Sequence, residues 1–174
     1  MLILLIGPKG SGKSHIGRTL DAQLGVHFFH VEPLWMSYYE ECRANGTEPN
    51  ILEGIAKVHP RISACLRAHD HVCVETTGAS PEILNDLLDI ESPRNTLIAQ
   101  ILAPLELCLN RIATRDQTNQ IPMDIDSVRR VYSLSLAAEV QPQIVIENVS
   151  LSDMELVKIF KNVIPLAISK SQHG

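Results

Sequence analysis

The sequence has few aromatic residues, no excess of positive charge and no apolar run of membrane length at its start. Its 174 residues carry a formal net charge of -5, and 4% of them are aromatic. A protein that holds polymeric nucleic acid through the backbone phosphates needs a basic face, so this charge argues against such a partner. The opening apolar run, Leu2–Ile6, is too short to span a membrane and follows no basic segment. We therefore expect a cytoplasmic protein without a membrane or nucleic-acid partner.

Cysteine pairs of the C-x-x-C type are also absent. The four cysteines are scattered, and Cys73 and Cys108 fall inside apolar segments. We expect reduced thiols in or near the core rather than metal ligands. With this length, 45% hydrophobic residues and no repeat or linker, residues 1–174 are predicted to form one domain. No pattern indicates an oligomeric state.

Short apolar runs alternate with longer segments of helical periodicity, which predicts an α/β fold with a parallel sheet covered on both faces. The expected strands are Leu2–Ile6, Val26–Val31, His71–Glu75, Thr96–Leu102 and Gln143–Glu147. The expected helices are Lys13–Leu24, Leu34–Asn45, Ile51–Ala68, Pro81–Leu88, Pro104–Arg115, Ser127–Glu139 and Ser152–Ala167.

Glycine is scarce, yet three glycines gather in the segment GPKGSGKS, Gly7–Ser14, between the first expected strand and helix. This segment completes the phosphate-loop pattern G-x-x-x-x-G-K-[ST], whose backbone N–H groups converge on phosphate oxygens at a helix N-terminus. In this pattern Lys13 reaches the β- and γ-phosphates and Ser14 binds magnesium. The sequence therefore predicts a site for ATP and Mg²⁺. The nucleotide-binding residues would be Gly7, Pro8, Lys9, Gly10, Ser11, Gly12, Lys13, Ser14 and His15.

Two expected strands end in carboxylates. Glu75 closes the third strand and Glu32 follows the second, and ligands of parallel sheets bind beyond the carboxyl ends of the strands. Glu75 could hold a magnesium-bound water or accept a proton from an attacking hydroxyl, and Glu32 could act as the base instead. The choice between them stays open. His30 is expected at the same rim as Glu32, where either residue could meet the phosphoryl acceptor, but a hydrogen-bonded, half-buried imidazole is the favoured interpretation for His30.

The segment 33–70, between the second and third expected strands, is predicted to be mostly helical and to flank the phosphoryl acceptor. Trp35, Tyr38 and Tyr39 share one helix face there, either as a stacking platform for a ring-bearing substrate or as core. Arg43 and Arg61 are candidates for gripping a substrate anion, although most arginines of this kind lie on the surface.

Two arginines four residues apart, Arg111 and Arg115, are expected on one helix face directly before a polar stretch, and they predict a short lid over residues 115–126. One guanidinium can lie against an adenine ring while the next neutralises charge on the transferring phosphoryl group.

The chain resembles the nucleoside-monophosphate kinase and shikimate kinase branch of phosphate-loop kinases over most of its length. The matching landmarks are GPKGSGKS, the strand-end motif ETTG (Glu75–Gly78) and RIATRD (Arg111–Asp116). The resemblance implies a five-stranded sheet in the order 2-3-1-4-5, a preference for adenine, and an acceptor held by the insertion at 33–70. It also implies that Arg111 packs on adenine, that Arg115 is the lid arginine, and that a loop containing Asn148 and Val149 touches adenine.

The sequence departs from shikimate kinases at two places, and shikimate is not the expected acceptor. His30 and Glu32 stand where two aspartates are usual, and Thr76 and Thr77 replace part of a glycine triplet. Two functions remain: a Mg²⁺-dependent kinase that phosphorylates a small metabolite, with nucleosides and nucleotides among the candidates, or a nucleotide-binding switch or slow ATPase that acts through a protein partner. The paired arginines and short length favour the kinase.

Overall fold

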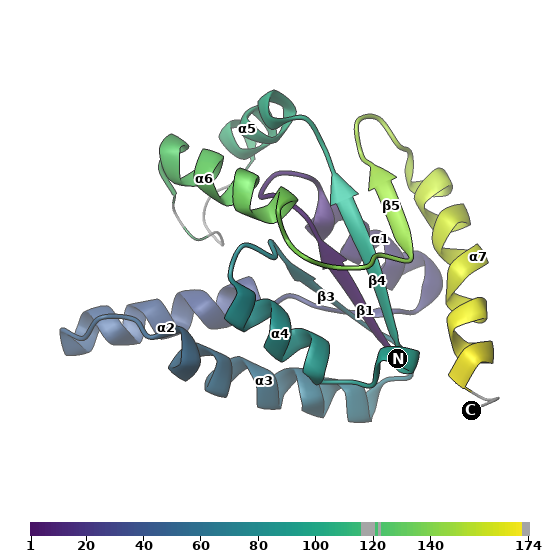
Figure 1. The fold of residues 1–174 in the computed structure, drawn as a ribbon, viewed down its shortest axis with the longest axis horizontal. Helices are drawn as coiled ribbons and strands as arrows, with labels where there is room; N and C mark the ends of the chain where they lie inside the picture. The colour runs from purple at the N-terminus through teal and green to yellow at the C-terminus, as the bar shows by residue number, and fades with distance from the viewer. Residues whose placement is uncertain (116–120, 122, 172–174) are drawn as a thin grey trace.

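Five parallel strands form the central sheet, in the order β2-β3-β1-β4-β5 (Figure 1). The structure is a computed structural model that describes residues 1–115, 121 and 123–171. The predicted α/β fold and strand order are confirmed. The strands are β1 (Leu2–Ile6), β2 (His27–Phe29), β3 (Val72–Thr76), β4 (Thr96–Leu102) and β5 (Ile144–Glu147).

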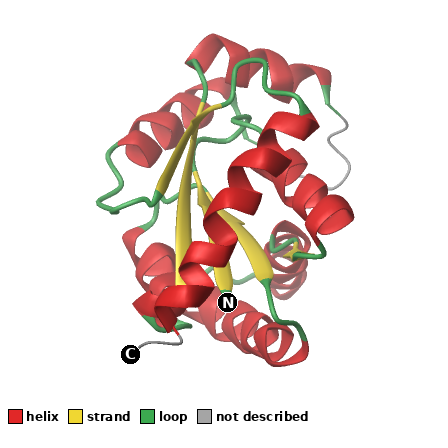
Figure 2. Cartoon of the chain, turned by 90° about the vertical axis from the view of Figure 1, so that its right-hand side faces the viewer, coloured by secondary structure: helices red, strands yellow, loops and turns green. Residues whose placement is uncertain are grey.

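Helices cover both faces of this sheet, so the molecule has three layers (Figure 2). Within the described residues, no helix combines the length and apolar character that crossing a membrane requires. The helices are α1 (Lys13–Leu24), α2 (Glu32–Asn45), α3 (Ile51–Ala68), α4 (Pro81–Asp89), the 3-10 helix η1 (Pro93–Asn95), α5 (Leu105–Thr114), α6 (Ile125–Leu136) and α7 (Asp153–Ser171).

The central strand β1 organises the core, because alternate side chains of a strand point to opposite faces of the sheet. Every residue of β1 is buried. Ile3 and Leu5 pack with residues of α1 and α7, whereas Leu4 and Ile6 pack with residues of α2, α3 and α4. Burial on both faces explains why β1 is a continuous apolar run rather than an alternating one.

The structure corrects several predicted element ends. β2 is shorter than the expected strand at 26–31, because the backbone of Val31 already has a helical conformation at the N-cap of α2. Glu32 consequently begins α2, where its negative charge lies at the positive end of the helix. α5 ends at Thr114, so Arg115 lies outside the helix with an extended backbone.

Helices α2 and α3 lie side by side and form the insertion between β2 and β3 (Figure 1). Trp35 of α2 packs against Gly54 of α3, where a Cβ atom would overlap the indole ring. The Tyr38 hydroxyl donates to the carbonyl of Asn50 over 2.9 Å and accepts from the Asn50 N–H over 2.8 Å. The side chain of Asn50 also caps α3. These contacts determine how the two helices face each other.

Gly54→Ala should destabilise the protein, because the added methyl group must displace the Trp35 ring. At an exposed helical position this substitution would stabilise by up to about 1 kcal/mol, whereas overpacking costs about 1–3 kcal/mol. Urea denaturation measures the difference in unfolding free energy, with Ser63→Ala on the same helix as a control. Unchanged or increased stability of Gly54→Ala would contradict the contact between Trp35 and α3.

Candidate active site

A cavity of about 610 Å³ opens beside the phosphate loop, at the carboxyl ends of β1 and β3. Ligands of parallel α/β sheets bind at this end. The insertion helices α2 and α3 and the helices α4 and α5 complete its walls. The structure thus brings together most of the residues singled out in the sequence. Those that line the cavity are Lys9, Gly10, Gly12, Lys13, Ser14, His15, Glu32, Glu75, Arg111 and Arg115.

The phosphate loop approaches its neighbours so closely that side chains at its glycines do not fit. A Cβ atom at Gly7 would overlap the carbonyl oxygen of Ile101, and one at Gly12 would overlap the amide of Asn148. Gly10 and Gly12 also have φ values of 84° and 98°, in the left-handed region that favours glycine. The glycines therefore allow both the backbone curl and the tight packing of the loop.

Lys13, the first residue of α1, is buried beneath this loop. Its Nζ donates to the carbonyl oxygens of Gly7 over 2.8 Å and Pro8 over 2.9 Å. Burial lowers the pKa of Lys13, and the carboxylate of Glu75 opposes that shift. The ammonium group is thus held at the loop by backbone oxygens, within the cavity where phosphates are expected.

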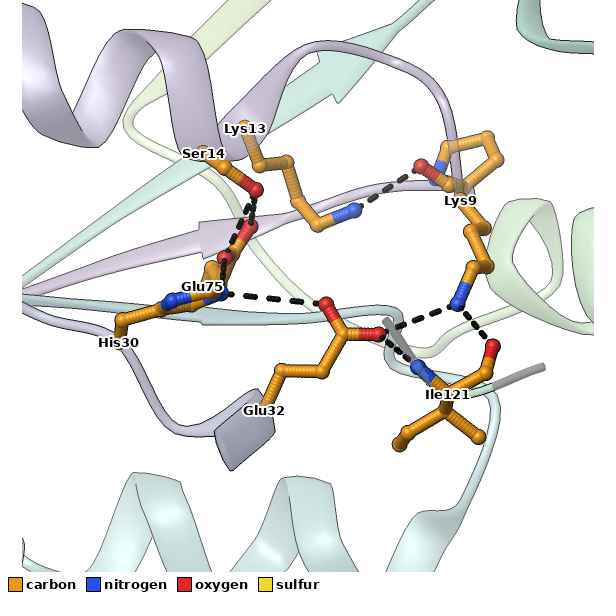
Figure 3. Close-up of polar contacts among 8 residues, drawn as sticks. Lys9, Lys13, Ser14, His30, Glu32, Glu75 and Ile121 are labelled. Carbon is orange, nitrogen blue, oxygen red and sulfur yellow. Dashed lines mark hydrogen bonds and ion pairs between the residues drawn. The ribbon is translucent and has the colours of Figure 1, made fainter. Parts of the chain in front are cut away.

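Ser14 and Glu75 form a direct contact between α1 and the end of β3 (Figure 3). The Ser14 hydroxyl lies 2.9 Å from Oε1 and 3.0 Å from Oε2 of Glu75, and the Glu75 residue is 8% exposed. A hydroxyl and a carboxylate are the hard oxygen ligands that Mg²⁺ accepts when it also keeps waters and phosphate oxygens. The two residues predicted as metal ligands therefore fit this ion.

His30 lies near both carboxylates, at the rim where the sequence places it, but its Nε2 is buried without a hydrogen-bond partner among the described residues. Its Nε2 lies 3.5 Å from Glu75 Oε1 and 3.8 Å from Glu32 Oε2 (Figure 3). The imidazole is half-buried, as expected, but it faces the site. The one available signal was its position, two residues before Glu32 at the end of β2.

Glu32 is bound on several sides. Its Oε1 accepts from Lys9 Nζ over 3.1 Å and from the backbone N–H of Ile121 over 2.9 Å, and Lys9 also donates to the Ile121 carbonyl over 2.8 Å. Burial alone would raise the pKa of Glu32, but the nearby imidazole of His30, the hydrogen bonds from Ile121 and Lys9 and the charge of Lys9 lower it to about 2. So acidic a carboxylate is a poor proton acceptor near neutral pH.

Arg115 has a guanidinium without a hydrogen-bond partner at Nε and Nη2 among the described residues, although both atoms are buried. Burial lowers its pKa, while Glu32 and Glu75 act in the opposite direction. A buried arginine with free donors suits an anionic ligand, since arginine binds phosphate strongly. Residues 116–120 and 122 of the predicted lid at 115–126 lie outside the described residues.

Arg111 lies within α5, whereas Arg115 lies just beyond its end, and both line the cavity. Its Nη2 donates to the carbonyls of Asn148 over 3.0 Å and Val149 over 3.3 Å, and its Nη1 approaches the carbonyls of Gly10 and Ser11. The expectation that both arginines share one helix face is therefore wrong. The expected neighbours Arg111, Asn148 and Val149 do come together.

Asn148 and His15, both predicted to contact the nucleotide, also contact other parts of the protein. The Asn148 side chain donates to the Ser11 carbonyl over 2.8 Å and holds the phosphate loop from behind. His15 is exposed, and its Nε2 lies 2.8 Å from Oδ1 of Asp153, at the start of α7. The first contact places the end of β5 beside the loop, and the second places the start of α7 beside α1.

The aromatic cluster of the insertion divides between the cavity and the core. Trp35 and Tyr39 line the cavity, whereas Tyr38 is buried and turns its hydroxyl to the start of α3. Arg43 and Arg61, the candidates for gripping an anion, are exposed and do not line the cavity.

One group of potential metal ligands lies outside this site. Ligand atoms of His27, Cys65 and His69 lie within 4.8 Å of one another. The two imidazole rings are stacked, with centroids 4.1 Å apart and planes 3° from parallel. Lone pairs of imidazole lie in the ring plane, so two parallel rings do not converge on one ion. We interpret the group as a stacked pair beside a thiol.

Comparisons with known proteins agree with this architecture. A family profile described as AAA domain matches residues 2–131, more than half of the sequence. The chain belongs to this AAA domain family. Comparison with curated protein sequences finds no match.

Solved structures similar to this AAA domain protein include several small-molecule kinases. A sugar kinase from Janibacter sp. HTCC2649 has a TM-score of 0.65 at 13% identity, covering 97% of this chain and 96% of that one. A deoxyadenosine kinase from M. mycoides has a TM-score of 0.62 at 14% identity, covering 95% and 99%. Shikimate kinase from Aquifex aeolicus has a TM-score of 0.57 at 18% identity, covering 97% and 99%. The predicted resemblance to the phosphate-loop kinase fold is confirmed.

Acid should destabilise this AAA domain protein partly through Glu32. Its pKa is about 2 in the folded protein and 4.5 ordinarily. A lowered pKa stabilises the folded state above about pH 4.5, and that contribution, on the order of 3 kcal/mol, is lost as the pH falls toward about 2. Urea unfolding at about pH 7 and about pH 3 should show a smaller loss of stability for Glu32→Gln than for the unaltered protein. The exposed Glu48→Gln serves as control, and an equal loss in Glu32→Gln would contradict the contacts of Glu32.

Proposed function

We propose that this protein is an ATP- and Mg²⁺-dependent kinase that transfers the γ-phosphoryl group to a small acceptor. The contact between Ser14 and Glu75 carries the proposal, because it places a metal-type oxygen pair beside Lys13 in one cavity. Arg115, with its unpartnered buried nitrogens, adds a cation without a competing hydrogen-bond acceptor at these atoms among the described residues.

Each part of the site would have a separate task. The backbone of Gly7–Ser14 would bind the phosphates, with Lys13 exchanging its carbonyl partners for phosphate oxygens. Ser14 and Glu75 would hold Mg²⁺, which neutralises phosphate charge when bound. Arg115 would stabilise charge on the transferring group, and Arg111 would lie at the adenine with Asn148 and Val149.

The acceptor hydroxyl attacks the γ-phosphorus of ATP, and the bond to the β–γ bridging oxygen breaks. ADP leaves with that oxygen, and the hydroxyl proton passes to a carboxylate of the site. The low pKa of Glu32 and its bonds to Lys9 and Ile121 suit a structural clamp. We therefore assign the acceptor-orienting role to Glu75, with His30 as a positioning residue beside it.

The proposal also assigns functions to whole segments of the chain. Residues 1–174 would act as one kinase domain, with the insertion at 33–70 holding the acceptor and the segment 115–126 acting as a lid. Lys9 and Glu32 contact Ile121 and so connect this segment to the phosphate loop and to α2. A lid joined in this way would close near the phosphates and exclude water.

The direct test is ATP consumption with Mg²⁺ against nucleosides, nucleoside monophosphates, sugars and small hydroxy acids. ADP formation and phosphorylated product are measured together. Acceptor-dependent ADP with a matching amount of product is the expected result. Slow hydrolysis that no acceptor stimulates would contradict a kinase and favour a nucleotide-binding switch or ATPase.

Glu75→Gln and Glu32→Gln should separate the two carboxylates. We expect Glu75→Gln to keep ATP binding in the absence of Mg²⁺ and to lower kcat by at least about 10²–10⁴-fold, because it removes a Mg²⁺ ligand as well as the proton acceptor, whose usual contribution is of this size. Glu32→Gln should retain most of kcat, whereas Lys13→Ala should lose ATP binding. Binding by calorimetry and turnover by product formation give both quantities. Normal turnover of Glu75→Gln with a large loss in Glu32→Gln would reverse the assignment.

A further inference from the structure

The cavity has an apolar end, remote in sequence from the phosphate loop and built by the insertion and α4. Trp35 and Tyr39 come from α2, Ile55 and Val58 from α3, and Ile83 and Leu87 from α4. Apolar side chains gathered on one wall of a ligand cavity favour an apolar part of the ligand, because they remove its surface from water.

The two aromatic rings at this end are held in place. Trp35 is 7% exposed and is backed by Gly54 of α3. The rings of Trp35 and Tyr39 have centroids 6.1 Å apart and planes 35° apart. Rings fixed by packing lose little conformational freedom when a ligand binds, so they suit contact with a flat, rigid group.

Positive charge is missing from this end of the described cavity. Its cationic lining residues are in the phosphate loop, α1 and the end of α5: Lys9, Lys13, Arg18, Arg111 and Arg115. Lysines and arginines of α2, α3 and α4 do not line the cavity, and Lys57 instead pairs with Glu41 over 2.6 Å.

The one charged side chain that α4 adds to the cavity wall within the described residues is acidic. This residue is Asp86, whose Oδ1 lies 2.7 Å from Nδ1 of His59. A carboxylate or phosphate placed here would be removed from water without a cationic partner and would face this carboxylate, both unfavourable. A hydroxyl or amide N–H could instead donate to Asp86.

We propose that the acceptor is an uncharged alcohol that carries a flat, rigid ring, and that Trp35 and Tyr39 determine this specificity. The inference rests on the proposed kinase function. The ring lies against the two aromatic side chains, and the reacting hydroxyl reaches Glu75 and His30. Neutral nucleosides belong to this class, whereas shikimate and nucleoside monophosphates do not.

Fluorescence tests the proposal directly, because Trp35 is the one tryptophan of the chain. With ADP and Mg²⁺ saturating the nucleotide site, the protein is titrated with ring-matched pairs: thymidine against thymidine 5′-monophosphate, and 2-phenylethanol against phenylacetate. The neutral member should change the Trp35 emission and bind at least about 10-fold more tightly, which corresponds to ~1.4 kcal/mol. Equal or tighter binding of the anionic members, or no change with either pair, would overturn the proposal.

Variants separate recognition from folding and from catalysis. Tyr39→Leu keeps apolar volume but removes the ring, and it should weaken binding of the neutral alcohol by about 10-fold, within the usual range for a contact aromatic side chain. Arg43→Ala and Arg61→Ala, outside the cavity, are the matched controls and should leave that binding unchanged. Loss of binding in the arginine variants with none in Tyr39→Leu would overturn the proposal.

Product formation distinguishes failure of this inference from failure of the kinase assignment. If an anionic probe is phosphorylated in preference to its neutral partner, the protein is a kinase and the inferred acceptor class is wrong. If neutral probes bind at Trp35 but no probe is phosphorylated, the apolar site stands and the kinase assignment is contradicted.

Discussion

The architecture depends on the close packing of the phosphate loop against the residues at the carboxyl end of the sheet. Gly7 leaves no room for a side chain beside β4, and Gly12 leaves none beside Asn148, which follows β5. Asn148 and Arg111 then bind carbonyl groups of the same loop from outside. A loop packed this closely is held in one conformation, which is what preorganised phosphate binding would require.

Two glutamates of similar position acquire different properties through their neighbours. Glu32 accepts hydrogen bonds from a lysine and a backbone amide, and its proton affinity falls accordingly. Glu75 instead accepts from a neutral hydroxyl, that of Ser14, so its oxygens remain suited to a metal or an acceptor. His30 lies between the two glutamates and connects Glu32 to the candidate active site. The two residues are of the same type, so it is their surroundings that suit Glu32 to a structural role and Glu75 to a chemical one.

Local signals in the sequence predicted the phosphate loop and most elements, because their patterns involve neighbouring residues. The strand order came from the family resemblance. Contacts between distant segments were not predictable: Glu32 meets Ile121 across 89 positions, and nothing near either residue indicates it. The position of Arg115 beyond α5, with Arg111 inside it, depends on one helix end, and helix ends are set by packing as well as by propensity.

The separation of charge within the cavity bears on a requirement of every kinase, the suppression of ATP hydrolysis. Water competes with the acceptor for the γ-phosphoryl group, and it is held in place only where several polar groups can bind it. Ile55, Val58 and Leu87 offer no such hydrogen bonds, so the wall they form does not position a water for attack. In the proposed kinase, an acceptor that fills this end would displace poorly held water and bring its own hydroxyl to Glu75. In the proposed kinase, the apolar wall would therefore favour both the acceptor and transfer over hydrolysis.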